Sequence, residues 1–76
     1  MEQKIKIKIF DKDYIVKGEV DPLYIKKIAN HLNERIDQVQ TKFRNLSREQ
    51  VIILAAMNIT DDFMQLYDLI EEEKKR

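Results

Sequence analysis

The chain has 76 residues, with 14 basic and 14 acidic side chains that cancel, one histidine, one glycine and no cysteine. A domain of this size buries only about 60% of the surface that its unfolded chain exposes, so we expect self-association to contribute stability. Without cysteine the chain can form neither disulfides nor thiolate metal sites. Its balanced charge lacks the basic excess of a non-specific nucleic-acid binder, and no stretch reaches the roughly 18 apolar residues of a membrane span.

Residues 4–10 alternate lysine and isoleucine and predict a half-buried β-strand, with the isoleucines on one face and the lysines on the other. Residues 11–13 place two aspartates around a lysine, a composition that favours a tight turn. Residues 14–17 are rich in β-branched and aromatic side chains. We therefore predict an antiparallel hairpin, which the chain leaves at Gly18.

Asp21 and Pro22 predict the start of a first helix, because an aspartate side chain accepts from an orphan backbone N–H and proline fits the first helical position. Apolar side chains then recur at spacings of three and four: Ile25, Ile28, Leu32, Ile36, Val39 and Phe43. This spacing predicts an amphipathic helix that ends near residue 43 and is followed by a short polar turn.

Residues 47–50 have the form of a capping box, and Leu46 and Val51 on either side are placed as a hydrophobic staple. No glycine or proline follows, so we predict a second helix that continues to residue 70 or later. Its apolar side chains alternate spacings of four and three, which is typical of a coiled-coil seam: Ile52, Ala56, Ile59, Phe63, Leu66 and Ile70.

The second helix divides into two zones. Residues 51–59 are apolar on nearly every side, and residues 59–70 keep a narrower seam. One helix and one hairpin cannot cover a helix that is apolar on most sides, so we expect a second copy of the chain to pack there. The predicted fold class is α+β with a dimeric head, in a single domain 1–76 that comprises a globular head 1–58 and the start of a coiled-coil tail 59–76.

The sequence offers little for catalysis. His31 is the only histidine, and the adjacent Asp61 and Asp62 do not face each other on a helix, so we predict neither a metal site nor a paired acid and base. No glycine-rich phosphate loop or hydrolase motif is present. We expect no enzyme activity and no cofactor. Because the amino terminus opens no continuous apolar run, we also expect a cytosolic protein without membrane attachment.

Two other interpretations stay open. Lys4, Lys6 and Lys8 precede two helices, and ribbon-helix-helix repressors use such a basic strand in a dimer to contact the major groove of DNA. A second strand, a long first helix and zero net charge count against DNA binding, and lysines on an edge strand also serve to prevent further pairing. The second of these interpretations is a coiled-coil adaptor that binds another partner protein.

The order of these segments resembles the ZapA family, bacterial cell-division proteins that associate with the tubulin-like GTPase FtsZ. The resemblance spans essentially the whole chain. It rests on the hairpin at residues 7–16, the Asp21-Pro22 helix start, residues 31–35 on the first helix, and residues 46–59 around the second cap. It implies a homodimer built through the heads, with tails that pair two dimers into an antiparallel tetramer. Such an assembly would bundle FtsZ protofilaments in the division ring at mid-cell, without nucleic acid or membrane as a partner.

The resemblance also implies where FtsZ binds, namely on charged residues from the hairpin turn and the start of the second helix. The matching positions are Lys12, Arg44 and Glu49, with Lys42 and Arg48 nearby. Asp11 stands where family members often carry glycine, so a different type of turn is expected. The seam covers about three heptads before residue 76, fewer than relatives usually carry, so the resemblance implies the dimer more directly than the tetramer.

Overall fold

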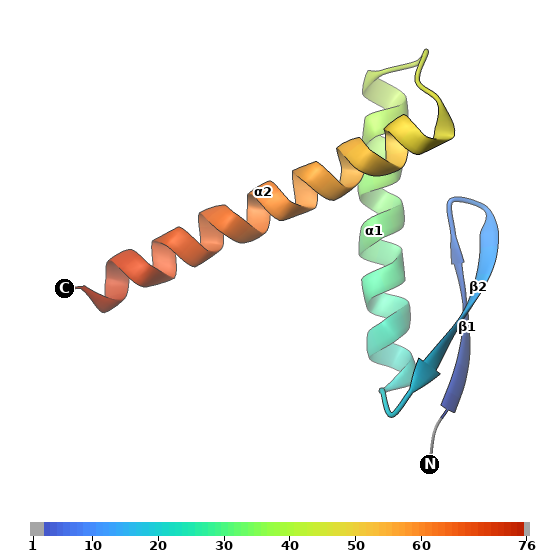
Figure 1. Cartoon of the computed structure of the whole chain (residues 1–76), viewed down its shortest axis with the longest axis horizontal. Coiled ribbons are helices and arrows are strands. Elements are labelled where there is room, and N and C mark those ends of the chain that lie inside the picture. Colours follow the sequence, from blue (N-terminus) through green and yellow to red (C-terminus); the bar gives the residue numbers. More distant parts are fainter. Residues whose placement is uncertain (1–2, 76) are drawn as a thin grey trace.

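The computed structural model describes residues 3–75 and contains a hairpin followed by two helices (Figure 1). The elements in chain order are β1 (Gln3–Ile9), β2 (Lys12–Gly18), α1 (Pro22–Lys42) and α2 (Arg48–Lys74). β1 and β2 form a two-stranded antiparallel sheet, and α1 packs against both β1 and α2. The α+β architecture predicted from the sequence is confirmed.

The hairpin turn is tighter than predicted and lies earlier in the chain. Ile9 pairs with Lys12, so Phe10 and Asp11 alone form the loop, and their φ angles are 52° and 66°. Two successive left-handed residues are the mark of a type I′ turn, whose twist matches that of the flanking strands. The prediction of a turn at residues 11–13 was wrong because the ring of Phe10 leaves the strand to pack against the core, which lets pairing begin already at Lys12.

Both helices begin at the predicted caps. The Asp21 side chain accepts from the backbone N–H of Leu23 at 3.0 Å. Ser47 Oγ accepts from the backbone N–H of Gln50 at 3.1 Å, and Gln50 Oε1 accepts from the backbone N–H of Ser47 at 2.9 Å, which completes the capping box. Leu46 packs against the core cluster that contains the first apolar side chain of α2, as a hydrophobic staple requires.

The apolar face of α1 is narrower than the sequence spacing predicts. Its buried residues are Ala29, Ile36 and Val39. Ile28 and Phe43 were expected on the same face, but they are 48% and 46% exposed. The prediction was wrong for Ile28 because, within residues 3–75, β1 and α2 cover only the arc of the helix that carries the three buried residues. It was wrong for Phe43 because α1 ends at Lys42, and Phe43 follows it in an extended conformation.

The hydrophobic core lies where α1, the start of α2 and the hairpin turn meet. Its centre consists of four side chains that are at most 3% exposed: Ile36, Val39, Val51 and Ala55. Partly buried side chains surround it: Ile9, Phe10, Leu32, Leu46 and Leu54. Among the described elements, β2 contacts β1 and neither helix, so it takes no part in this core. A core of this size gives a lone chain marginal stability.

α2 extends beyond the rest of the chain as an arm. The molecule measures 45 × 43 × 15 Å, so it is long in two directions and thin in the third. Figure 1 shows α2 crossing α1 near the C-terminal end of α1 and continuing alone from there. The buried residues of α2, Val51 and Ala55, lie in its first turns. Within residues 3–75, neither helix combines the length and the apolar content that crossing a bilayer needs.

Candidate functional site

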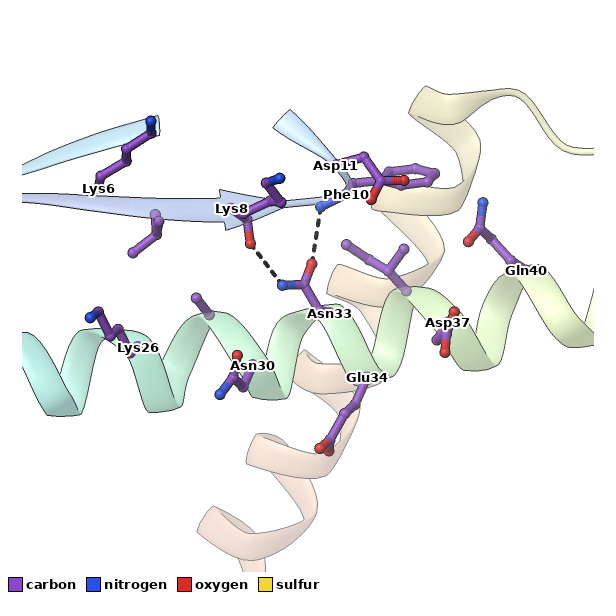
Figure 2. A pocket seen from close by; sticks show the side chains of 13 residues that line it. Lys6, Lys8, Phe10, Asp11, Lys26, Asn30, Asn33, Glu34, Asp37 and Gln40 are labelled. Atoms are coloured by element: carbon purple, nitrogen blue, oxygen red, sulfur yellow. Dashed lines mark hydrogen bonds between the residues drawn. The ribbon is translucent and has the colours of Figure 1, made fainter. Parts of the chain in front are cut away.

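The side-chain amide of Asn33, in the middle of α1, holds the hairpin turn in place. Its Oδ1 accepts from the backbone N–H of Phe10 at 3.0 Å, and its Nδ2 donates to the carbonyl oxygen of Lys8 at 2.8 Å (Figure 2). One amide that accepts and donates in this way reproduces the pairing that the peptide group of a neighbouring strand makes with β1. The turn is thereby anchored to α1.

Arg48, the first residue of α2, makes a second contact with the same turn. Its Nη2 donates to the carbonyl oxygen of Phe10, and its guanidinium carbon lies 4.0 Å from the centroid of the Phe10 ring. A cation over an aromatic ring contributes about 0.5–1 kcal/mol at an exposed site. Asn33 bonds the N–H of Phe10 and Arg48 bonds its carbonyl, so both helices hold a backbone conformation that an aromatic residue seldom adopts.

These contacts bring the predicted FtsZ-binding segments together at one end of the molecule. Figure 1 shows the hairpin turn, the connection between α1 and α2, and the start of α2 at this end. We call it the turn surface, and its five predicted binding residues are all exposed: Lys12, Lys42, Arg44, Arg48 and Glu49. Two of them contact aromatic rings. The Arg48 guanidinium lies over the ring of Phe10 in the hairpin turn, and the Lys42 ammonium lies 5.6 Å from the centroid of the Phe43 ring.

The predicted seam of α2 is largely uncovered in the single chain. Ile59 is half-buried and Ala56 is exposed, while the four larger seam residues are between 38% and 61% exposed: Ile52, Phe63, Leu66 and Ile70. Other apolar side chains of the same helix are also exposed: Ile53, Met57, Met64, Tyr67 and Leu69. Apolar surface of this extent along one helix indicates a contact with another molecule.

An ion pair links α1 to the middle of α2. Arg35 of α1 donates through Nη2 to the carboxylate of Asp62 on α2. The adjacent Asp61 has another partner, because it accepts from Nε2 of Gln65 at 2.8 Å. The two aspartates therefore face in different directions, as residues one apart on a helix do.

The side chains on the outside of the described chain form exposed charged groups and apolar stripes. Among residues 3–75, no three histidine, cysteine or acidic side chains lie together as metal ligands would. His31 is exposed on α1.

The sequence model of one protein family covers this architecture. The model described as "Cell division protein ZapA" matches residues 5–76, which is nearly the full length of the chain. The chain belongs to the ZapA family. This membership supports a role in cell division.

Individual ZapA proteins and a solved ZapA structure agree with the family assignment. The cell division protein ZapA of Shouchella clausii strain KSM-K16 is 22% identical over 72 residues, covering 95% of this chain and 92% of the relative. That of Geobacillus kaustophilus strain HTA426 is 22% identical over 76 residues, covering 96% and 84%. A ZapA mutant dimer from Geobacillus stearothermophilus matches with a TM-score of 0.73 at 20% identity, covering 100% of this chain and 92% of that one.

The ZapA fold also decides against the ribbon-helix-helix interpretation. In that class the β-ribbon is made of one strand from each of two chains. Here both strands come from one chain, joined by the turn at Phe10 and Asp11. The basic strand is therefore half of a hairpin that packs on α1, which differs from the ribbon-helix-helix alternative.

The sequence pattern of this ZapA-family protein does not mark Asn33 as the anchor of the turn. Asn33 stands among polar residues of α1, and its partners lie 23 and 25 positions away in the chain. Its place on the border of the apolar face, next to Leu32, was the available signal. Arg48 was proposed as a binding residue, and the structure gives it a contact with the turn in addition.

Proposed function

We propose that this protein binds FtsZ and bundles FtsZ protofilaments, and that it promotes Z-ring assembly and septum formation without catalysing a reaction. Membership of the ZapA family supports this function. The structural observation that carries it is the contact of Arg48 with the hairpin turn, because that contact unites Lys12 with the start of α2 in a single charged surface. We assign FtsZ binding to this turn surface, with Lys12, Arg44 and Glu49 as its main residues and Lys42 and Arg48 beside them.

Bundling requires at least two FtsZ-binding surfaces on one particle, and we propose that self-association supplies them. Residues 51–59 would join two heads into a dimer, and the seam at residues 59–70 would recruit a second dimer. The exposed apolar side chains of α2 support both contacts. Several weak sites on one rigid body raise the effective concentration of each site and hold neighbouring filaments together. This assigns residues 1–58 to the head and 59–76 to the tail.

Co-sedimentation of polymerised FtsZ tests the proposed surface. We expect Lys12→Glu and Arg44→Glu to reduce the bundled FtsZ in a low-speed pellet at least about fivefold. Each substitution replaces a cation by a carboxylate, and like charges placed opposite each other across an interface cost on the order of 1 kcal/mol or more. Lys27→Glu is the matched control, since it reverses the same charge at an exposed position in the first half of α1. Sedimentation velocity of each variant alone should be unchanged.

Normal bundling by both Lys12→Glu and Arg44→Glu would show that the turn surface does not bind FtsZ. A wild-type protein that self-associates but leaves FtsZ filaments unbundled would contradict the proposed function itself. That second result would favour the coiled-coil adaptor, which shares the exposed α2 stripe and differs in its partner.

A further inference from the structure

The edge of β1 that faces away from β2 carries backbone groups that the hairpin does not use. In a hairpin with a two-residue loop, the residues that flank the loop form a hydrogen-bonded pair, and bonded and non-bonded pairs alternate from there. The isoleucines of β1 therefore bond to β2, and its lysines direct their N–H and C=O groups to the opposite edge. The carbonyl of Lys8 and the N–H of Phe10 show this direction, because both bond to Asn33 of α1.

A groove of about 740 Å³ runs between β1 and α1 on the side where Asn33 meets the strand (Figure 2). Lys6, Ile7 and Lys8 form its β1 wall. Near the hairpin turn, the Asn33 amide already occupies the place of a strand residue beside β1. Within residues 3–75, no third strand continues the sheet beyond that amide.

The part of the groove beyond Asn33 is basic. Figure 2 shows Lys6 and Lys8 on β1 and Lys26 on α1 at this end, whereas Asp11 and Asp37 lie toward the hairpin turn and Glu34 lies on α1 near Asn33. Among residues 3–75, Lys6 Nζ lies 3.5 Å from the Asp13 carboxylate, while neither Lys8 nor Lys26 forms an ion pair. Within residues 3–75, this edge thus combines backbone groups of Lys4 and Lys6 that the hairpin does not use with the charges of Lys8 and Lys26, which no acidic side chain neutralises.

We propose that the free edge of β1 binds an extended acidic segment of a partner protein by strand addition. Backbone hydrogen bonds to β1 would supply affinity, as they do when a peptide extends an exposed sheet edge. Carboxylates at alternate positions of the segment would lie beside Lys4, Lys6 and Lys8, where opposite charges on neighbouring strands attract. The side chains between them would face the groove at the half-buried Ile7, so the segment alternates acidic with apolar residues. This surface is separate from the turn surface and does not depend on FtsZ binding.

A second copy of β1 is a poor occupant of the same edge. Antiparallel pairing of two β1 strands places lysines against lysines, and like charges opposite each other on paired strands are destabilising. Lysines are a common means of keeping edge strands of identical chains apart. The charge that repels another β1 strand attracts an acidic one, so the edge discriminates between the two.

Fluorescence polarisation with a short labelled peptide that alternates valine and glutamate tests this proposal on the full-length protein. Lys6→Pro removes an N–H that points to the free edge, and it takes no hydrogen bond from the β1–β2 ladder. Lys17→Pro is the matched control, since Lys17 pairs with Lys4 and directs its N–H to the outer edge of β2. Circular dichroism verifies that both variants are folded.

We expect the peptide to bind the wild type and Lys17→Pro alike, and to bind Lys6→Pro about tenfold or more weakly. A peptide methylated on alternate backbone nitrogens keeps its charge and should lose the same affinity for the wild type, which tests the proposal even if Lys6→Pro does not fold. Equal binding of the methylated peptide, or of a peptide that alternates valine and lysine, would overturn strand addition by an acidic segment. The proposal would also be overturned if the acidic peptide did not bind at all. A loss of self-association in Lys6→Pro would overturn it too, because it would show that this edge binds a second copy of the chain.

Discussion

The ring, the backbone conformation and the backbone polar groups of Phe10 each contribute to the fold. Its ring packs against the core cluster, its backbone adopts a left-handed conformation with φ of 52°, and its two backbone polar groups bond to side chains of different helices. The left-handed conformation costs a non-glycine residue on the order of 1 kcal/mol. The contacts with Asn33 and Arg48 offset that cost. Through them, Phe10 connects the sheet to both helices.

Asn33→Ala should destabilise the protein by about 1–2 kcal/mol, because it leaves the N–H of Phe10 and the carbonyl of Lys8 without their partner. Urea unfolding at fixed protein concentration measures this change, since self-association contributes to the apparent stability. Asn30→Ala is the control, as Asn30 is an exposed residue of the same helix and should cost less than about 0.5 kcal/mol. Equal midpoints for the two variants would show that the Asn33 bonds do not stabilise the turn.

At the scale of secondary structure, α2 is one continuous helix whose two parts have different surroundings. Its first turns contribute Val51 and Ala55 to the core and begin at a complete capping box. Beyond the ion pair between Arg35 and Asp62, most of its large apolar side chains are about half exposed. The first part is thus held by its own chain, whereas the second part needs contacts from another molecule to be covered.

Ser47→Ala should lower the free energy of unfolding by about 1 kcal/mol, within the 0.5–2 kcal/mol typical of a lost helix cap. The hydroxyl accepts from the N–H of Gln50, and alanine leaves that donor without its bond inside the chain. Thermal unfolding followed by circular dichroism reports the change. Thr60→Ala provides the comparison, because the Thr60 hydroxyl only bonds back to the Ala56 carbonyl within the same helix. A cost for Ser47→Ala no larger than for Thr60→Ala would contradict the role of the cap.

At the scale of the whole molecule, the single chain leaves much apolar surface open on two helices. Besides α2, the first half of α1 exposes Leu23 at 76%, Tyr24 at 59% and Ile28 at 48%. Among the described residues 3–75, the main core cluster contains four buried side chains, each at most 3% exposed. A second chain that covers α2 would add burial at roughly 25 cal/mol per Å² of apolar area, which is the contribution a small core lacks.

Phe63→Glu and Ile59→Glu should reduce self-association, because each places a carboxylate in the proposed apolar seam, where it has no partner. Gln65→Glu is the matched control, since it adds the same charge two residues from Phe63 on another face of α2. We expect sedimentation velocity to show a shift toward monomer for the seam variants and none for the control. Seam variants that remain fully associated would show that another face of the helix mediates assembly.

Local signals in the sequence predicted most of the secondary structure. The caps at Asp21 and Ser47 depend on residues within three positions of each other, and alternation or helical spacing is likewise a property of neighbours. The turn was misplaced because Asp11 and Asp13 carry the local turn preference, whereas the packing of Phe10 on the core decides where the strand ends.

The candidate site was harder to predict from the sequence, because it also depends on contacts between residues far apart in the chain. Charged residues near the turn and the second cap could be named from the resemblance to the ZapA family. That these segments meet depends on bonds from Asn33 and Arg48 to Phe10, which join positions between 23 and 38 residues apart. No spacing rule along the chain encodes such a bond, because it forms only after the helices and the hairpin have packed.

The sequence by itself determined the α+β class, the starts of both helices and the apolar character of α2, since each of these follows from interactions between near neighbours along the chain. The tertiary structure decided the type I′ turn, the narrow buried face of α1 and the union of the turn with the start of α2. It also decided which edge of β1 stays open, because that depends on the register of the hairpin and on the place of Asn33 beside it.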